Sequence, residues 1–169
     1  MRMFEVKTTA GASKEETYRE LAVQLTGLLT AETDGLANAA NTAALLFAGL
    51  GEVNWAGFYF LRDGELVLGP FQGKVACVRL TLGRGVCGTA AQRRTTVVVT
   101  DVEQFPGHVA CDHASRSEIV VPLVKSGRLI GVLDVDSPLL ARFDATDAAG
   151  LEKIAEIFLQ HTDLRQLVD

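Results

Sequence analysis

The residues of this sequence best suited to chemistry are its three cysteines. Cys111 lies in a polar stretch, residues 107–118, that runs directly into the apolar residues 119–124, and a thiol in such a loop is placed to react. Cys77 and Cys87 lie in the middle third of the chain, so either could reach Cys111 only if the fold brings separate segments together. The odd count and the lack of a Cys-x-x-Cys pair argue against a secreted disulfide framework. Thiol redox chemistry is therefore the first hypothesis.

Acidic side chains form a second group. Asp134 and Asp136 end an apolar strand, and strand alternation points both to the same face. Glu118 opens the strand expected to pair with theirs. If the three carboxyls converge in a confined site, like charges and desolvation raise at least one pKa, so a proton is held near neutral pH. Such a neutral acid can protonate a weakly basic oxygen as it leaves. For the two aspartates alone, a solvated strand end is the plainer interpretation.

The strand register decides between these interpretations. A two-residue turn at 126–127 pairs Lys125 with Arg128 and places Glu118 opposite Val135, pointing away from the two aspartates. Convergence therefore requires a three-residue turn, a bulge, or a Glu118 that lies outside the ladder.

The segment 54–60 contains Trp55, the one tryptophan of the chain, and Tyr59. Alternation predicts that these two share a face with Gly57. They are either ordinary core residues or an aromatic wall for a small apolar group, which would also favour positive charge developing on sulfur.

Two tempting sites are set aside. Residues 83–88 fit the glycine fingerprint of dinucleotide-binding folds, but that fingerprint acts in a parallel βαβ unit, and the flanking strands here read as antiparallel. We interpret it as a glycine turn that opens a short helix, whose backbone amides could still line a pocket. A zinc site is not expected, because the soft ligands lack a close pair. These ligands are Cys77, Cys87, Cys111, His108 and His113.

The composition limits the classes of function. The chain has 169 residues, 48% of them hydrophobic, which suits one globular domain with a sizeable core. Its net charge of -5 and scattered Lys and Arg exclude an electrostatic footprint for nucleic acid or an anionic membrane. The N-terminal residues lack a signal peptide and no run is long enough to span a membrane. A cytoplasmic protein with free or redox-active thiols is expected.

The elements that must position these residues follow from hydrophobic periodicity. Helical spacing predicts helices from Lys14 and from Asp34, a short one over 86–93 and a last one capped by Asp144. Strands are expected over 53–61, 65–71, 76–80, 95–100, 119–124 and 129–135, with an irregular segment at 101–117. Helices at both ends of a hairpin-rich middle indicate an α+β fold with an antiparallel sheet. We expect an arm over residues 1–13 and one domain over 14–169.

Several motifs together resemble the free methionine-(R)-sulfoxide reductases, which are single-domain GAF proteins. The resemblance covers nearly the whole chain and includes all three cysteines in the family's order. The motifs are NWAGFY at 54–59, LGPFQGK at 68–74, ACVR at 76–79, GRGVCGT at 83–89, GHVACD at 107–112, SEIV at 117–120 and IGVLDVDS at 130–137.

The resemblance implies a GAF-like central antiparallel sheet, with helices packed on one face and a loop-covered pocket on the other. It also implies reduction of free L-methionine (R)-sulfoxide to methionine, with thioredoxin or a similar dithiol restoring the enzyme and no cofactor or metal. Cys111 matches the family's nucleophile and Cys77 the partner of its disulfide, while Cys87 matches a third cysteine whose role is left open.

On this interpretation Cys111 attacks the sulfoxide sulfur and becomes a sulfenic acid, which Cys77 resolves. The acids Glu118, Asp134 and Asp136 bind and protonate the oxygen, while Trp55 and Tyr59 hold the substrate methyl group. The oligomeric state is left open, with a homodimer as one option. Two other functions also stay open: a catalytically silent GAF module that binds a metabolite, and a thiol redox sensor that would need the cysteines but not the acids.

Overall fold

The computed structural model describes residues 4–107 and 112–168, which form one sheet with helices on both faces. The helices of this part of the chain are α1 (Lys14–Leu29), α2 (Gly35–Gly49), α3 (Gly85–Arg93) and α4 (Ala145–His161), with two short 3-10 turns, η1 (Val102–Gln104) and η2 (Leu164–Gln166). The strands are β1 (Trp55–Arg62), β2 (Glu65–Gly73), β3 (Arg79–Thr81), β4 (Val97–Val99), β5 (Ser117–Lys125) and β6 (Arg128–Ser137).

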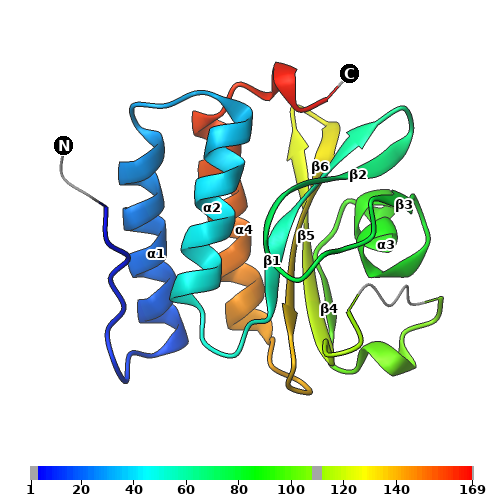
Figure 1. Ribbon diagram of the computed structural model, residues 1–169, viewed down its shortest axis with the longest axis horizontal. Helices are drawn as coiled ribbons and strands as arrows, with labels where there is room; N and C mark the ends of the chain where they lie inside the picture. The colour runs from blue at the N-terminus through cyan, green and yellow to red at the C-terminus, as the bar shows by residue number, and fades with distance from the viewer. Residues whose placement is uncertain (1–3, 108–111, 169) are drawn as a thin grey trace.

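The sheet is antiparallel throughout, with the strand order β3-β2-β1-β6-β5-β4. Helices α2 and α4 lie against one face, and α1 packs on them from outside (Figure 1). Helix α3 lies on the opposite face, against β5 and β6. The expected α+β fold is confirmed, and on this face residues of α3 line a pocket together with residues of β1, β5 and β6.

Local sequence explains where the long helices begin. Ser13 caps α1: its hydroxyl accepts a hydrogen bond from the backbone N–H of Glu16, and the Glu16 carboxylate accepts one from the backbone N–H of Ser13. Asp34 caps α2, and Asp144 caps α4 in a second capping box, completed by Asp147. The helix starts predicted at Lys14, Asp34 and Asp144 are therefore confirmed.

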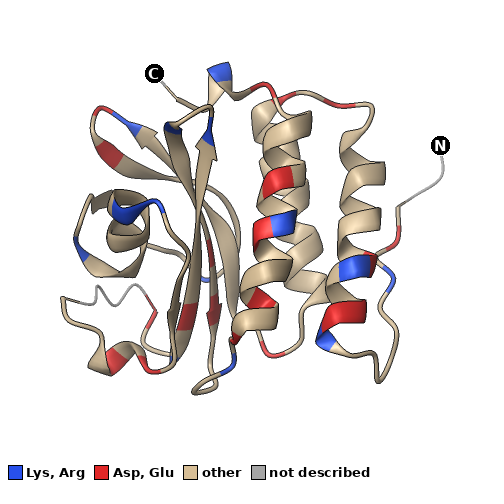
Figure 2. Ribbon diagram, turned by 180° about the vertical axis from the view of Figure 1, so that it is seen from behind, with Lys and Arg blue, Asp and Glu red and all other residues tan. Residues whose placement is uncertain are grey.

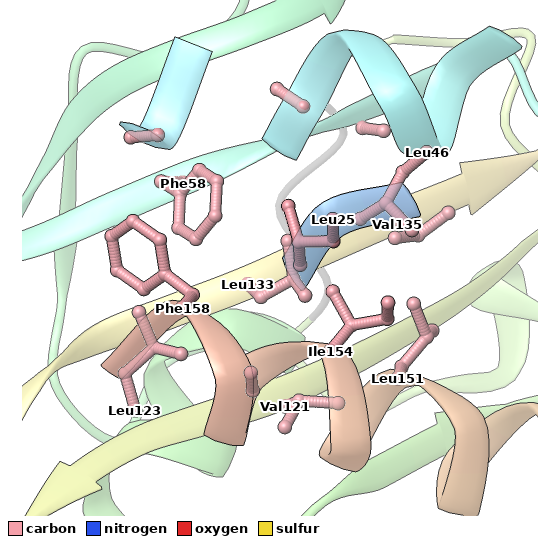
Figure 3. Packing of buried hydrophobic residues seen from close by; sticks show 14 of the residues in the cluster. Leu25, Leu46, Phe58, Val121, Leu123, Leu133, Val135, Leu151, Ile154 and Phe158 are labelled. Carbon is pink, nitrogen blue, oxygen red and sulfur yellow. The ribbon is translucent and has the colours of Figure 1, made fainter. Parts of the chain in front are cut away.

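The main core fills the space between the sheet and the three long helices (Figure 3). Phe58 of β1 packs against Phe158 of α4, with ring centroids 4.8 Å apart. Leu133 and Val135 of β6 point into the same layer. Alternation along β6 therefore leaves Asp134 and Asp136 to the opposite face, as expected.

The strands expected at the sheet edges are shorter than the sequence predicts. The strand expected over 76–80 is reduced to β3, because the carbonyl oxygens of Lys74 and Cys77 accept hydrogen bonds from side chains of β1 instead of pairing with β2. The strand expected over 95–100 is reduced to β4. The irregular segment that follows contains η1, which Asp101 caps.

The described part of the N-terminal arm, residues 4–13, has no helix or strand. It is held on α1, where Lys7 and Gln24 exchange two hydrogen bonds of 2.8 Å. Lys and Arg are dispersed over helices, turns and strands rather than gathered on one element (Figure 2). Among the helices of residues 4–107 and 112–168, none has the length and apolar character needed to cross a membrane.

Candidate active site

A bulge in β6 sets the geometry of the site. Lys125 pairs with Arg128, as a two-residue turn requires. Further along the hairpin Leu123 pairs with Gly131, which leaves Ile130 as an extra residue on β6. An extra residue on one strand shifts every later pair of the ladder by one position, so residues that would have pointed to opposite faces of the sheet now point to the same face. Of the three arrangements that the sequence left open, the structure therefore has the bulge.

The bulge brings the three acids to one face. Glu118 lies directly opposite Asp136 in the ladder, not opposite Val135 as an unbulged hairpin would place it. On the other side of β6, Trp55 pairs with Asp136 and faces the same way. Cross-strand neighbours on one face lie about 5 Å apart at Cβ. The acids of β5 and β6 and the aromatic start of β1 therefore form one contiguous surface.

Gly131 is the residue that lets the bulged strand approach β1. A Cβ built at Gly131 would lie 2.1 Å from the carbonyl oxygen of Tyr59 and 2.9 Å from the Cα of Phe60. Both contacts are with backbone, which cannot move aside as a side chain can. The strand register that brings the three acids to one face therefore requires a glycine at position 131.

Helix α3 adds a thiol to this surface. The Cys87 Sγ donates to Glu118 Oε1 over 3.9 Å, and Asp134 lies close enough that one ligand atom from each of the three residues is within 4.8 Å of the others. Gly88 permits this position, because a Cβ there would lie 2.2 Å from the carbonyl oxygen of Thr81. The glycine motif is thus a tight turn into α3, as predicted, and its residues line the pocket.

Burial controls the charge of the cluster. Glu118 and Asp134 are 7% and 6% exposed. Desolvation raises the pKa of Asp134 to about 7. Desolvation, and then the neighbouring Asp134 carboxylate, raise the pKa of Glu118 and of Asp136 well above their usual ranges. Glu118 and Asp136 therefore keep their protons at neutral pH, while Asp134 titrates near it, so the converging acids hold protons as expected.

Cys87 is equally constrained. Desolvation, then the carboxylates of Asp134 and Glu118, raise the pKa of its thiol well above the usual range. A buried, protonated thiol is a weak nucleophile. Cys87 is a free thiol in the structure, and its contact with Glu118 is that of a hydrogen-bond donor.

Aromatic rings form the wall beside the acids. Trp55 stacks on Phe71 with centroids 5.3 Å apart and on Tyr59 at 6.0 Å. Gly57 lies between the two β1 rings, and a Cβ there would meet the Trp55 ring at 2.7 Å. Trp55 and Tyr59 both line the pocket, on one face with Gly57 as alternation predicts. They are buried and also part of the site, so the core and pocket interpretations of these residues are compatible.

The segment that carries Cys77 closes one side of the pocket. The carbonyl oxygen of Lys74 accepts from Trp55 Nε1 at 3.1 Å, and that of Cys77 accepts from the Tyr59 hydroxyl at 3.0 Å. Cys77 is disulfide-bonded in the structure. Cys111 and His108 lie outside the described residues, so the positions predicted for the nucleophile and for this histidine are not described here.

Three polar residues of the site were missed by the sequence argument. Asn54 donates to the carboxylate of Asp112 at 3.3 Å and to the hydroxyl of Ser115 at 3.1 Å, and Asp112 and Ser115 line the pocket. The backbone amide of Ala114 and then Lys74 lower the pKa of Asp112. The signal for Asp112 and Ser115 was their position near Cys111 in a polar loop, and that for Asn54 was its position next to Trp55.

The predicted residues are thus brought together in large part. Those that line one pocket are Trp55, Tyr59, Cys87, Glu118, Asp134 and Asp136. Cys87, Glu118 and Asp134 are close enough to hold a divalent cation, but burial raises the pKa of all three, which opposes the loss of protons that metal binding requires. His113, named with the soft ligands, is exposed.

Comparison with known proteins identifies the family. Residues 30–159 match the GAF domain. The chain is 50% identical over 157 residues to the free methionine-R-sulfoxide reductase of Escherichia coli, and the match covers 91% of this chain and 95% of that protein. It is 40% identical over 160 residues to the protein of the same name from Saccharomyces cerevisiae, and that match covers 90% of this chain and 89% of the yeast protein. The crystal structure of the Neisseria meningitidis free methionine-R-sulfoxide reductase with its substrate superposes with a TM-score of 0.90 at 49% identity, covering 94% of this chain and 95% of that one. The chain therefore belongs to the GAF domain family and, within it, to the free methionine-R-sulfoxide reductases.

Proposed function

We propose that this protein reduces free L-methionine (R)-sulfoxide to methionine, and that thioredoxin or a similar dithiol restores it. The observation that carries the proposal is the buried group of acids, whose pKa values burial raises, beside an aromatic wall. The relatives that bear the reductase name cover nearly the whole chain, which supports the same activity here.

The acids act on the sulfoxide oxygen. Asp134 Oδ1 is buried and has no hydrogen-bond partner among the described residues. A neutral carboxyl at this position can donate a hydrogen bond to the oxygen of a bound sulfoxide. Glu118 and Asp136, whose pKa values are raised, hold further protons. Protonation turns a poor leaving oxygen into a good one.

The cysteines supply the electrons. The Cys111 thiolate attacks the sulfoxide sulfur, the S–O bond breaks, and the oxygen passes to Cys111 as a sulfenic acid while methionine leaves. The substrate gains two electrons and Cys111 loses two. The Cys77 thiol then attacks the sulfenic sulfur, water leaves, and a Cys77–Cys111 disulfide forms. An external dithiol reduces this bond by exchange and becomes a disulfide itself.

The aromatic wall selects the substrate. We assign Trp55 and Tyr59 the task of holding the methyl group on sulfur, since their rings lie beside the acids. With the oxygen fixed by the acids and the methyl group by the rings, one epimer at sulfur presents its back side to the nucleophile. The relatives named free methionine-R-sulfoxide reductase support the (R) epimer as the one selected.

The test is thioredoxin-coupled turnover with separated (R) and (S) free methionine sulfoxide. The (R) epimer should be reduced, Cys111→Ser should be inactive, and Cys77→Ser should complete at most about one turnover with thioredoxin, because its sulfenic acid is not resolved. Full multiple turnover by Cys111→Ser would overturn the mechanism. Equal rates on both epimers would overturn the role given to the wall.

The same assay separates an enzyme from a thiol redox sensor. Asp134→Asn should lose turnover, because the neutral amide is a far weaker proton donor than a carboxylic acid. A sensor would need only its cysteines, so the same variant would still oxidise normally with peroxide and the wild-type protein would not consume sulfoxide.

A further inference from the structure

Residues 74–78 form the short segment between β2 and β3 (Figure 1). This segment exposes apolar side chains next to the disulfide-bonded Cys77. Val75 is 87% exposed and Val78 is 64% exposed, on either side of Cys77. Scattered single apolar residues on a surface are ordinary. Val75 and Val78 lie on one short segment with the disulfide-bonded Cys77 between them, so they form a pair rather than isolated apolar residues.

The exposure is built into the fold. The carbonyl oxygens of Lys74, Cys77 and Val78 accept hydrogen bonds from Trp55, Tyr59 and the backbone of Leu68, at 3.1, 3.0 and 2.9 Å. Ala76 and Cys77 pack inward against the apolar cluster around the pocket. With these groups fixed inward, the two valines are left to face solvent.

We propose that Val75 and Val78 form the docking surface for the dithiol protein that reduces the Cys77 disulfide. The inference rests on the proposed function, because it names where that reductant binds. The occupant is a protein with an apolar surface around its reactive cysteine, whose thiolate must pass the two exposed valines to reach the disulfide of the half-buried Cys77. The disulfide then gains two electrons and two protons, and the partner's two thiols become a disulfide.

Size and charge favour this occupant over a second copy of the chain. Two valines bury too little area for a stable dimer, but transient redox complexes have the smallest interfaces. Charged side chains border the valines, since those of Lys74 and Arg79 are 70% and 53% exposed. An apolar centre with a charged rim is the usual anatomy of a protein interface.

The test compares two reductants of the same enzyme. Purified thioredoxin must dock, whereas dithiothreitol needs no protein surface. Val75 also lies at the rim of the pocket, so the variant is Val78→Ser, whose side chain is not among the pocket-lining residues. We expect the KM for thioredoxin to rise by about tenfold, the effect of truncating one well-packed interface residue. Turnover with dithiothreitol should be unchanged.

Two controls sharpen the result. Val78→Ile keeps the apolar surface and should keep the wild-type KM for thioredoxin. Val23→Ser removes an equally exposed valine on α1, 69% exposed, and should change neither reaction. An unchanged thioredoxin KM in Val78→Ser, or an equal loss with both reductants, overturns the docking surface. Wild-type protein that turns over with dithiothreitol but never with thioredoxin overturns the thioredoxin step and this inference, but not the reductase activity.

Discussion

Replacing Asp134 by Asn should make the protein more stable at alkaline pH while it destroys turnover. Asp134 is buried, and desolvation raises its pKa from the ordinary 3.8 to about 7. The folded protein therefore holds this proton more tightly than the unfolded chain does. Its contribution to stability is complete below the unfolded pKa and is lost as pH rises from about 4 to 7.

The size of the loss follows from the two pKa values. Each pKa unit corresponds to about 1.4 kcal/mol, so the difference between 3.8 and about 7 costs the folded state about 4 kcal/mol above neutral pH. Asn has the shape of the protonated acid and never ionises. Asp134→Asn should therefore be more stable than the wild type at pH 8 by up to about 4 kcal/mol, or about 10 °C in Tm.

The assay is urea unfolding of both proteins between pH 4.5 and 8.5. The difference between their free energies of unfolding should be small at the acidic end and should grow as pH rises. Asp134 also raises the pKa of Glu118 and Asp136, so the variant should retain a weaker pH dependence of the same sign. A variant that is less stable than the wild type at pH 8, or a difference that does not vary with pH, would refute the reasoning.

Asp144 provides a control of opposite sign. A hydrogen bond from Lys14, and then backbone amides, lower its pKa to about 2. A lowered carboxyl pKa stabilises the fold above the unfolded pKa, and this stabilisation is lost as pH falls. Asp144→Asn should therefore weaken the fold at neutral pH and matter little in acid.

Three further predictions concern the framework of the site. Gly131→Val places atoms against the Tyr59 carbonyl, so it should lower both the unfolding free energy, measured in urea, and the turnover, because the register of β6 cannot be kept. Asp147→Ala removes the buried carboxylate that binds Tyr18, Lys14 and Arg142. It should lower the free energy of unfolding by about 3–5 kcal/mol, with little effect on the KM for sulfoxide. Cys87→Ser keeps a donor to Glu118 and should retain most of its steady-state turnover, whereas Cys87→Ala should be slower.

The sequence predicts the elements well because both kinds of periodicity are clear. Each long helix has a capping residue at its start, and the end of β6, from Leu133 to Asp136, alternates between apolar and acidic residues. The shared face of Asp134 and Asp136 follows from that alternation. These features are local, so the residues themselves are enough to predict them.

The bulge could not be predicted in the same way. β6 is covered on both faces, so Leu129 and Ile130 are both apolar and both buried. When the residues on both faces of a strand are apolar, a change in which residue points to which face does not alter the hydrophobic pattern of the sequence. The one residue that marks it, Gly131, does so through contact with β1, some 70 positions earlier in the chain. The position of Cys87 beside Glu118 likewise depends on how α3 packs on the sheet.

The neutral cluster removes a difficulty in the proposed mechanism. Three ionised carboxylates would oppose the formation of the Cys111 thiolate. Because burial keeps protons on Glu118, Asp134 and Asp136, the desolvation that makes them proton donors also removes most of that repulsion. As pH rises through about 7, Asp134 ionises first, so its proton and the neutrality of the cluster are lost together. The alkaline fall in turnover should therefore have its midpoint near pH 7, where the loss of stability with rising pH is already complete. A fall in turnover centred at a clearly different pH would mean that a different group limits turnover.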